Sequence, residues 1–164
     1  MRILVSGMLA VALLTSQAAV AQCIRPTDHT AFDVTVLKTH LMVTALTCAA
    51  NEKYNAFVTK YQPELVQHDK ALGGYFSRAH GRRARQQQDD YVTQLANSQS
   101  QVGVVQGSLF CNRNIGMFDE VMALRSGSEL TDFAAGKAFA QPISLSACTD
   151  APATTKASKA RKRI

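Results

Sequence analysis

The segment from residue 32 to residue 48, FDVTVLKTHLMVTALTC, constrains the fold more than any other part of the chain. It is the most apolar stretch beyond the N-terminus, and only Asp33, Lys38 and His40 in it can carry a charge. Drawn as a helix, it is apolar on more than one face, which is typical of a helix packed against several neighbours. Its β-branched residues also allow a strand, but a strand usually stops well short of this length. We therefore expect a buried central helix.

Capping residues, prolines and glycines divide the rest of the chain into further helices. We expect residues 22–29 to be an irregular lead-in and Thr30 to cap the central helix. Pro63 suits the first turn of a new helix, and Gly81 separates that helix from the next. Ser126 begins a capping-box pattern. No alternating or hairpin pattern is present, so the prediction is an all-α fold: a small irregular or orthogonal bundle of about five to six helices.

The long run from residue 82 to residue 109 is polar at first and apolar later. Leu95, Val102 and Leu109 recur every seven residues, and Val92 and Val105 fill alternate positions. Such a repeat predicts a narrow apolar seam that faces one partner helix.

Residues 1–21 have the pattern of a secretory signal peptide. Arg2 gives a positive start, residues 3–14 are apolar, and small residues precede an expected cleavage site after Ala21. The apolar run is shorter than the roughly 20 residues of a membrane-spanning helix. We therefore expect export to the periplasm or the extracellular space, with no transmembrane segment after the signal is removed.

The four cysteines, Cys23, Cys48, Cys111 and Cys148, all follow the predicted cleavage site. Because exported proteins meet an oxidising compartment, an even count predicts two disulfides. No pair has the spacing of a redox motif or a zinc site. The pairing we favour is Cys48 with Cys111 and Cys23 with Cys148, although three pairings are possible. A lipoprotein would attach its lipid at Cys23, but Gln22 is larger than the residue that such a site prefers.

The C-terminal segment, residues 149–164, contains no aromatic residue and almost nothing to bury. We expect a disordered basic tail after a single helical domain at residues 22–148. The whole chain has 18 basic and 12 acidic residues, but residues 22–155 contain 12 of each. The basic side chains of the tail are Lys156, Lys159, Arg161, Lys162 and Arg163.

A second basic cluster lies within the predicted domain, in the sequence SRAHGRRAR. Its members, which we call the arginine corner, are Arg78, His80, Arg82, Arg83 and Arg85. Arginine suits phosphate and carboxylate because it donates paired hydrogen bonds, so the cluster is a candidate anion-binding site. The alternative is an ordinary solvated helix junction whose charge is balanced by Asp89 and Asp90.

Glu64 and His68 lie one helical turn apart and could converge with Tyr61 on one helix face. Such a group could bind a metal or transfer protons, but the same spacing is common on solvated helices. His40 lies in the most apolar segment, where a neutral, hydrogen-bonded imidazole is the expected state and a haem or metal ligand is the alternative.

The sequence carries no recognised catalytic or cofactor motif, so no cofactor and no metal is predicted. Our first hypothesis is a non-catalytic exported protein that binds an anionic envelope lipid or polysaccharide, or a protein partner, through the arginine corner and the tail. Nucleic acid is not expected as a specific partner, and the oligomeric state is open. The alternatives are an envelope enzyme or metal-dependent protein that uses Glu64 and His68, and a structural or stress-protective periplasmic protein.

Overall fold

The computed structural model describes residues 24–139, 141 and 142, and in that part the chain is helical with no strand. The helices are α1 (Pro26–Thr47), α2 (Asn51–Lys60), α3 (Gln62–His80), the 3-10 turn η1 (Gly81–Arg83), α4 (Ala84–Gln106), α5 (Ser108–Asn114), α6 (Met117–Ala123) and α7 (Gly127–Ala135). Within the described residues, α1, α2, α3, α4 and α7 are the longer helices. The all-α prediction is therefore confirmed. The predicted signal peptide, the Cys23–Cys148 pair and the basic tail lie outside the described residues.

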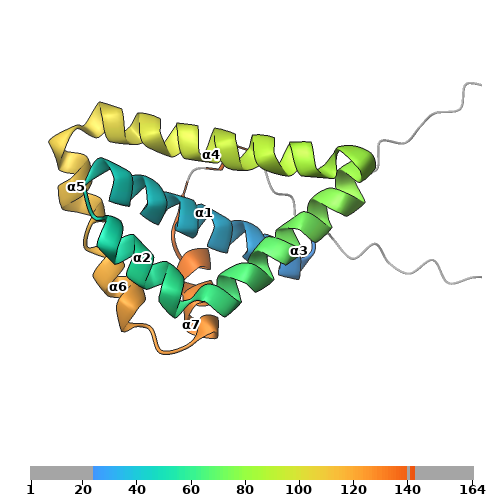
Figure 1. The fold of residues 1–164 in the computed structure, drawn as a ribbon, viewed down its shortest axis with the longest axis horizontal. Helices are drawn as coiled ribbons and strands as arrows, with labels where there is room; N and C mark the ends of the chain where they lie inside the picture. The colour runs from blue at the N-terminus through green and yellow to red at the C-terminus, as the bar shows by residue number, and fades with distance from the viewer. Residues whose placement is uncertain (1–23, 140, 143–164) are drawn as a thin grey trace, which may run out of the picture.

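Helix α1 runs through the middle of the molecule, as the apolar segment predicted (Figure 1). It contacts α2, α3, α4, α5 and α7, and Figure 1 shows α4 along one side of it and α2 and α3 along the other. One side of α1 packs into a core cluster with α2, α6 and α7, through residues such as Leu37 and Leu41. Phe32 and Val36 pack into a second cluster with α3 and α4. Two cores on different sides explain why α1 needs apolar residues on more than one face.

Helix α1 begins at Pro26, so the prediction of an irregular lead-in and a cap at Thr30 was wrong. Arg25 precedes the helix in an extended conformation, and proline is well suited to the first turn because its missing N–H would have no partner there. The Thr30 hydroxyl instead donates to the carbonyl oxygen of Pro26, 3.1 Å away.

The other predicted boundaries lie where the sequence placed them. Pro63 is in the first turn of α3, and Gly81 ends α3 with a φ of 54°. Ser126 caps α7: its hydroxyl accepts from the N–H of Glu129, whose carboxylate accepts from the N–H of Arg125. Both ends of the capping box are thus formed, with the glutamate reaching the residue before the cap.

The seven-residue seam of α4 was wrong in its second half. The buried residues of α4 are Tyr91, Leu95, Gln99 and Gly103, which recur every four residues. Helix α4 ends at Gln106, so Leu109 lies in α5 and does not continue the predicted seam, and Val102 is 43% exposed. Val105, in the last turn of α4, is 85% exposed.

A disulfide joins Cys48, the residue after α1, to Cys111 in α5. The two Cα atoms lie 5.6 Å apart and are 63 residues apart in sequence. This confirms the predicted pairing of these two cysteines and holds the end of the central helix against the second half of the bundle.

Candidate functional site

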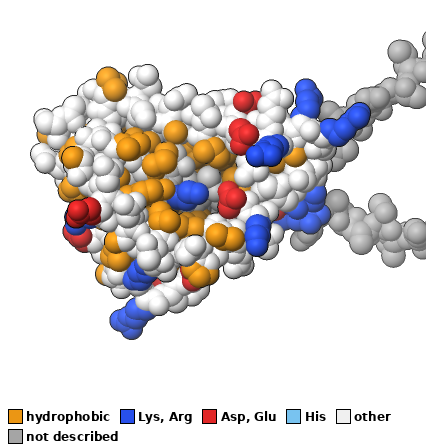
Figure 2. All heavy atoms as spheres, in the orientation of Figure 1, with side chains coloured by type: hydrophobic (Ala, Val, Ile, Leu, Met, Phe, Trp, Pro, Cys, Tyr) orange, Lys and Arg blue, Asp and Glu red, His pale blue; other side chains and the backbone are white. Residues whose placement is uncertain are grey.

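The arginine corner lies where α3, η1 and α4 meet, at one end of the molecule (Figure 1). Gly81 makes this sharp junction possible, because its φ of 54° is rarely adopted by other residues. The turn leaves Arg82, Arg83 and Arg85 exposed to solvent. Figure 2 shows basic side chains gathered at this end of the face in view, with acidic side chains nearby.

Arg78 differs from the other arginines because it is used within the fold. Its guanidinium pairs with the carboxylate of Asp28 at 2.5 Å, and the Asp28 side chain is only 6% exposed. The ion pair ties the C-terminal turn of α3 to the first turn of α1. Arg78 is therefore partly neutralised and contributes less free positive charge than the sequence predicted.

The same contact adds a residue that the sequence reasoning missed. Arg25 lies just before α1, three residues from Asp28, so the start of α1 brings an exposed arginine to this end of the molecule. The positive end of the α1 dipole points in the same direction. Only the Arg78–Asp28 pair reveals this arrangement, because no sequence spacing links residue 25 to residue 78.

The predicted balance by Asp89 and Asp90 is not formed as ion pairs among the described residues. Ion pairs there join His29 to Asp33, Lys53 to Asp119, Arg78 to Asp28 and Lys137 to Glu120. Within the described part of the chain, Arg82, Arg83 and Arg85 make no ion pair. Their charge is thus available to a partner.

His80 lies beside these arginines but turns toward the core. Its ring stacks on that of Phe76, with the centroids 5.7 Å apart and the planes at 25°. It therefore supports the junction by packing.

Tyr61 does not complete a site with Glu64 and His68. It is 2% exposed, and its hydroxyl donates to the carbonyl oxygen of Val121 at 2.7 Å, with that of Leu124 at 3.2 Å. The hydroxyl thus fastens the end of α6 to α2. The Tyr61 hydroxyl proton is used in this hydrogen bond and is not available to Glu64 or His68.

Glu64 and His68 remain close enough to interact electrostatically. Burial lowers the pKa of His68, and the negative charge of Glu64 partly offsets this effect. Glu64 Oε2 is buried without a hydrogen-bond partner among the described residues. In that part of the chain, no three histidine, cysteine or acidic side chains form a group that could hold a metal ion.

His40 has the hydrogen bond that its apolar surroundings predicted. Its Nε2 lies 2.9 Å from Asn114 Oδ1, and the Asn114 amide donates to the carbonyl oxygen of Phe110. Burial lowers the pKa of His40, and the hydrogen bond to Asn114 offsets part of this effect. The neutral ring packs against Phe139, at a centroid distance of 4.7 Å.

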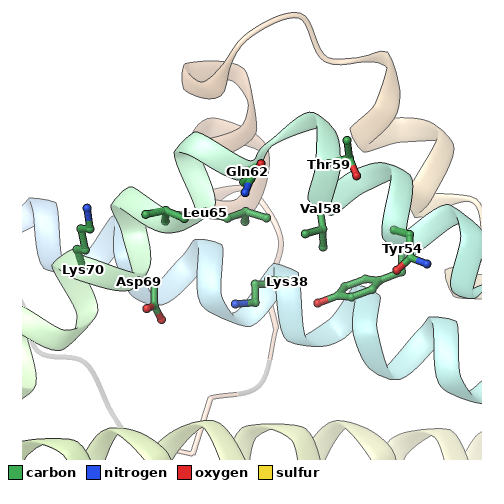
Figure 3. A pocket seen from close by; sticks show the side chains of 10 residues that line it. Lys38, Tyr54, Val58, Thr59, Gln62, Leu65, Asp69 and Lys70 are labelled. Atoms are coloured by element: carbon green, nitrogen blue, oxygen red, sulfur yellow. The ribbon is translucent and has the colours of Figure 1, made fainter.

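A groove between α1, α2 and α3, with a volume of about 640 Å³, was not anticipated from the sequence. Lys38 of α1 extends into it (Figure 3). The only signal in the sequence was a lysine within the most apolar segment, and nothing there indicated which neighbours would surround it.

No protein-family model matches the chain, and no curated protein and no solved structure matches it either. Among the described residues, no helix has the length and apolar character needed to cross a membrane. The class that the fold and the site define is an all-α bundle, stapled by a disulfide, with exposed arginines at one end.

Proposed function

We propose that this protein is an exported, non-catalytic helical protein that binds an anionic component of the cell envelope through the arginine corner and the basic tail. One observation carries the proposal: Arg82, Arg83 and Arg85 are exposed together and have no acidic partner in the described part of the chain. Guanidinium groups in this state can donate paired hydrogen bonds to phosphate, sulfate or carboxylate.

The predicted signal peptide and the tail supply the rest of the reasoning. Export would bring the corner to envelope lipid or polysaccharide, and the Cys48–Cys111 disulfide is compatible with an oxidising compartment. The tail, with five cations between residues 156 and 163, would add attraction of the same sign. Binding would be reversible and weakened by salt, because exposed charges are screened over about 10 Å at 0.1 M ionic strength.

Sedimentation with lipid vesicles tests the corner. The full chain should bind vesicles rich in phosphatidylglycerol and not vesicles of phosphatidylcholine. Replacing Arg82, Arg83 and Arg85 with glutamine should reduce partitioning about 100-fold, at about 1 kcal/mol for each basic residue near an anionic surface.

A matched control removes the same charge elsewhere. Lys53, Arg113 and Arg125 are exposed and lie outside the corner, so their replacement with glutamine should reduce partitioning much less. Equal losses in the two variants would show that net charge alone matters, and this would contradict a site at the corner.

The tail is tested by ending the chain at Thr155. This variant keeps the corner and removes all five basic residues of the tail. We expect weaker binding to the same vesicles, with the remaining binding abolished by the corner substitutions. Unchanged binding after truncation would remove the tail from the proposal.

A metal-dependent or enzymatic role for Glu64 and His68 is a second candidate. It is favoured by the unpartnered Oε2 of Glu64 and the lowered pKa of His68. Metal analysis of the purified original chain and of the His68→Ala variant tests this role. The same metal content in both proteins would contradict it.

A stress-protective role is a third candidate, favoured by exposed aliphatic residues on α4. Val104 is 77% exposed and Val105 is 85% exposed. If these side chains bind unfolded clients, replacing both with serine should weaken protection of a model client in an aggregation assay, while the corner variant should protect it normally.

A further inference from the structure

The groove between α1, α2 and α3 is walled by apolar side chains but has a charge on its floor. Val58 of α2 and Leu65 and Val66 of α3 line it. Lys38 rises from α1 between them, and Figure 3 shows its ammonium group lying in the open space of the groove. The volume, about 640 Å³, is within the usual range of small-molecule sites.

Lys38 is a half-buried residue whose ammonium group reaches the groove. Leu37 and Leu41 of the same helix are fully buried, whereas Lys38 lines the groove. Within the described residues, Lys38 makes no hydrogen bond and no ion pair. An ammonium group without a partner can pair with an anion that enters the groove.

A second donor faces the same space. The hydroxyl of Tyr54 points along the groove toward Lys38 in Figure 3, and it has no hydrogen-bond partner among the described residues. Burial raises the pKa of Tyr54, so the hydroxyl keeps its proton and can donate a hydrogen bond to an anion. Asp69, at the rim, is exposed and opposes an incoming negative charge.

From this arrangement we infer that the groove binds a single-chain anionic amphiphile, with its head group on Lys38 and Tyr54 and its hydrocarbon chain against Val58, Leu65 and Val66. An anionic head group would accept a charge-assisted hydrogen bond from the ammonium group of Lys38. The hydrocarbon chain would cover apolar surface that is otherwise open to water. This site is separate from the arginine corner, so it stands or fails independently of the proposed function.

Fluorescence titration with a dansyl-labelled undecanoic acid tests the inference. The full chain should bind the probe saturably, and dodecanoate should displace it. Dodecyl phosphate distinguishes a phosphate head from a carboxylate head, since the better competitor identifies the preferred group. Dodecanol and dodecylamine, which lack a negative charge, should displace the probe at least 10-fold less effectively. Equal displacement by dodecylamine would overturn the inference.

Substitutions in the groove locate the binding. Lys38→Met keeps the apolar stem and should weaken dodecanoate about 10-fold or more, whereas Lys70→Met at the exposed rim should have a small effect. Asp69→Asn should strengthen binding, because it removes the opposing charge. Unchanged affinity in Lys38→Met would contradict the site.

Two further variants distinguish binding in the groove from binding at the arginine corner and from dimer formation. Val66 is 46% exposed, so Val66→Asp should fold normally yet abolish binding. The glutamine variant of the arginine corner should bind the probe like the original chain. If sedimentation shows a dimer that Val66→Asp converts to a monomer, the groove is an interface between copies of the chain and the inference is wrong.

Discussion

At the scale of single residues, Tyr61 connects elements that are distant in sequence. Its buried hydroxyl donates to the carbonyl oxygen of Val121, which is 60 residues away. Tyr61→Phe would leave this carbonyl unpaired at little change in volume, so we expect a loss of about 1–3 kcal/mol in the free energy of unfolding. Urea denaturation measures the loss. Tyr54→Phe is the control, because that hydroxyl has no partner among the described residues, and an equal loss there would contradict the assignment.

His40 predicts how stability depends on pH. Burial lowers its pKa in the folded state below the ordinary value of 6.5. Below that pH the unfolded chain binds more protons than the folded chain, so the free energy of unfolding should fall as the pH drops through 6.5. Urea denaturation at pH 7.5 and 5.5 should show a smaller decrease for His40→Gln than for the original chain. Equal decreases would mean that His40 does not contribute.

At the scale of helices, Gly127 lets α7 approach α3. A Cβ atom at this position would lie 2.5 Å from Glu64 Cγ, which is too close for any real contact. Gly127→Ala should therefore lower the free energy of unfolding by about 1–3 kcal/mol. Adding Glu64→Ala should recover most of this loss, and simple additivity of the two changes in a double-mutant cycle would contradict the proposed contact.

The disulfide between α1 and α5 acts at the same scale. Closing a loop of 63 residues restricts the unfolded chain and is worth about 4 kcal/mol in the chain-entropy model. Replacing Cys48 and Cys111 with serine should reduce the free energy of unfolding by about this amount in urea denaturation. A loss below about 1 kcal/mol would indicate that the bond contributes little.

Local signals in the sequence predicted most helix boundaries. Pro63, Gly81 and Ser126 act through their own backbone geometry or hydrogen bonds, so their positions could be read without knowing the fold. The start of α1 was misplaced because Thr30 is an equally good cap by sequence, and only the packed structure selects Pro26. Val105 was misassigned because it was placed from spacing alone, whereas the buried face of α4 follows Gln99 and Gly103.

At the scale of the whole molecule, long-range contacts decided which basic residues are free. The sequence showed that these arginines are neighbours along the chain, but it could not show that Arg78 pairs with Asp28 or that α1 begins at the same end. It also could not reveal the groove, because three helices build it from residues spread between positions 38 and 70. A cluster of residues that are adjacent in sequence can therefore be found from the sequence alone. A site that forms only when distant segments pack together cannot.

The salt dependence of binding to phosphatidylglycerol vesicles tests the proposed function most directly. If the corner and the tail bind as positive charges, the partition coefficient should fall steeply between 50 mM and 500 mM salt. Replacing Arg82, Arg83 and Arg85 with glutamine should make this dependence clearly shallower, while the Lys53, Arg113 and Arg125 variant should keep it close to the original. Binding that does not change with salt, or a slope that the corner substitutions leave unaltered, would contradict the proposal.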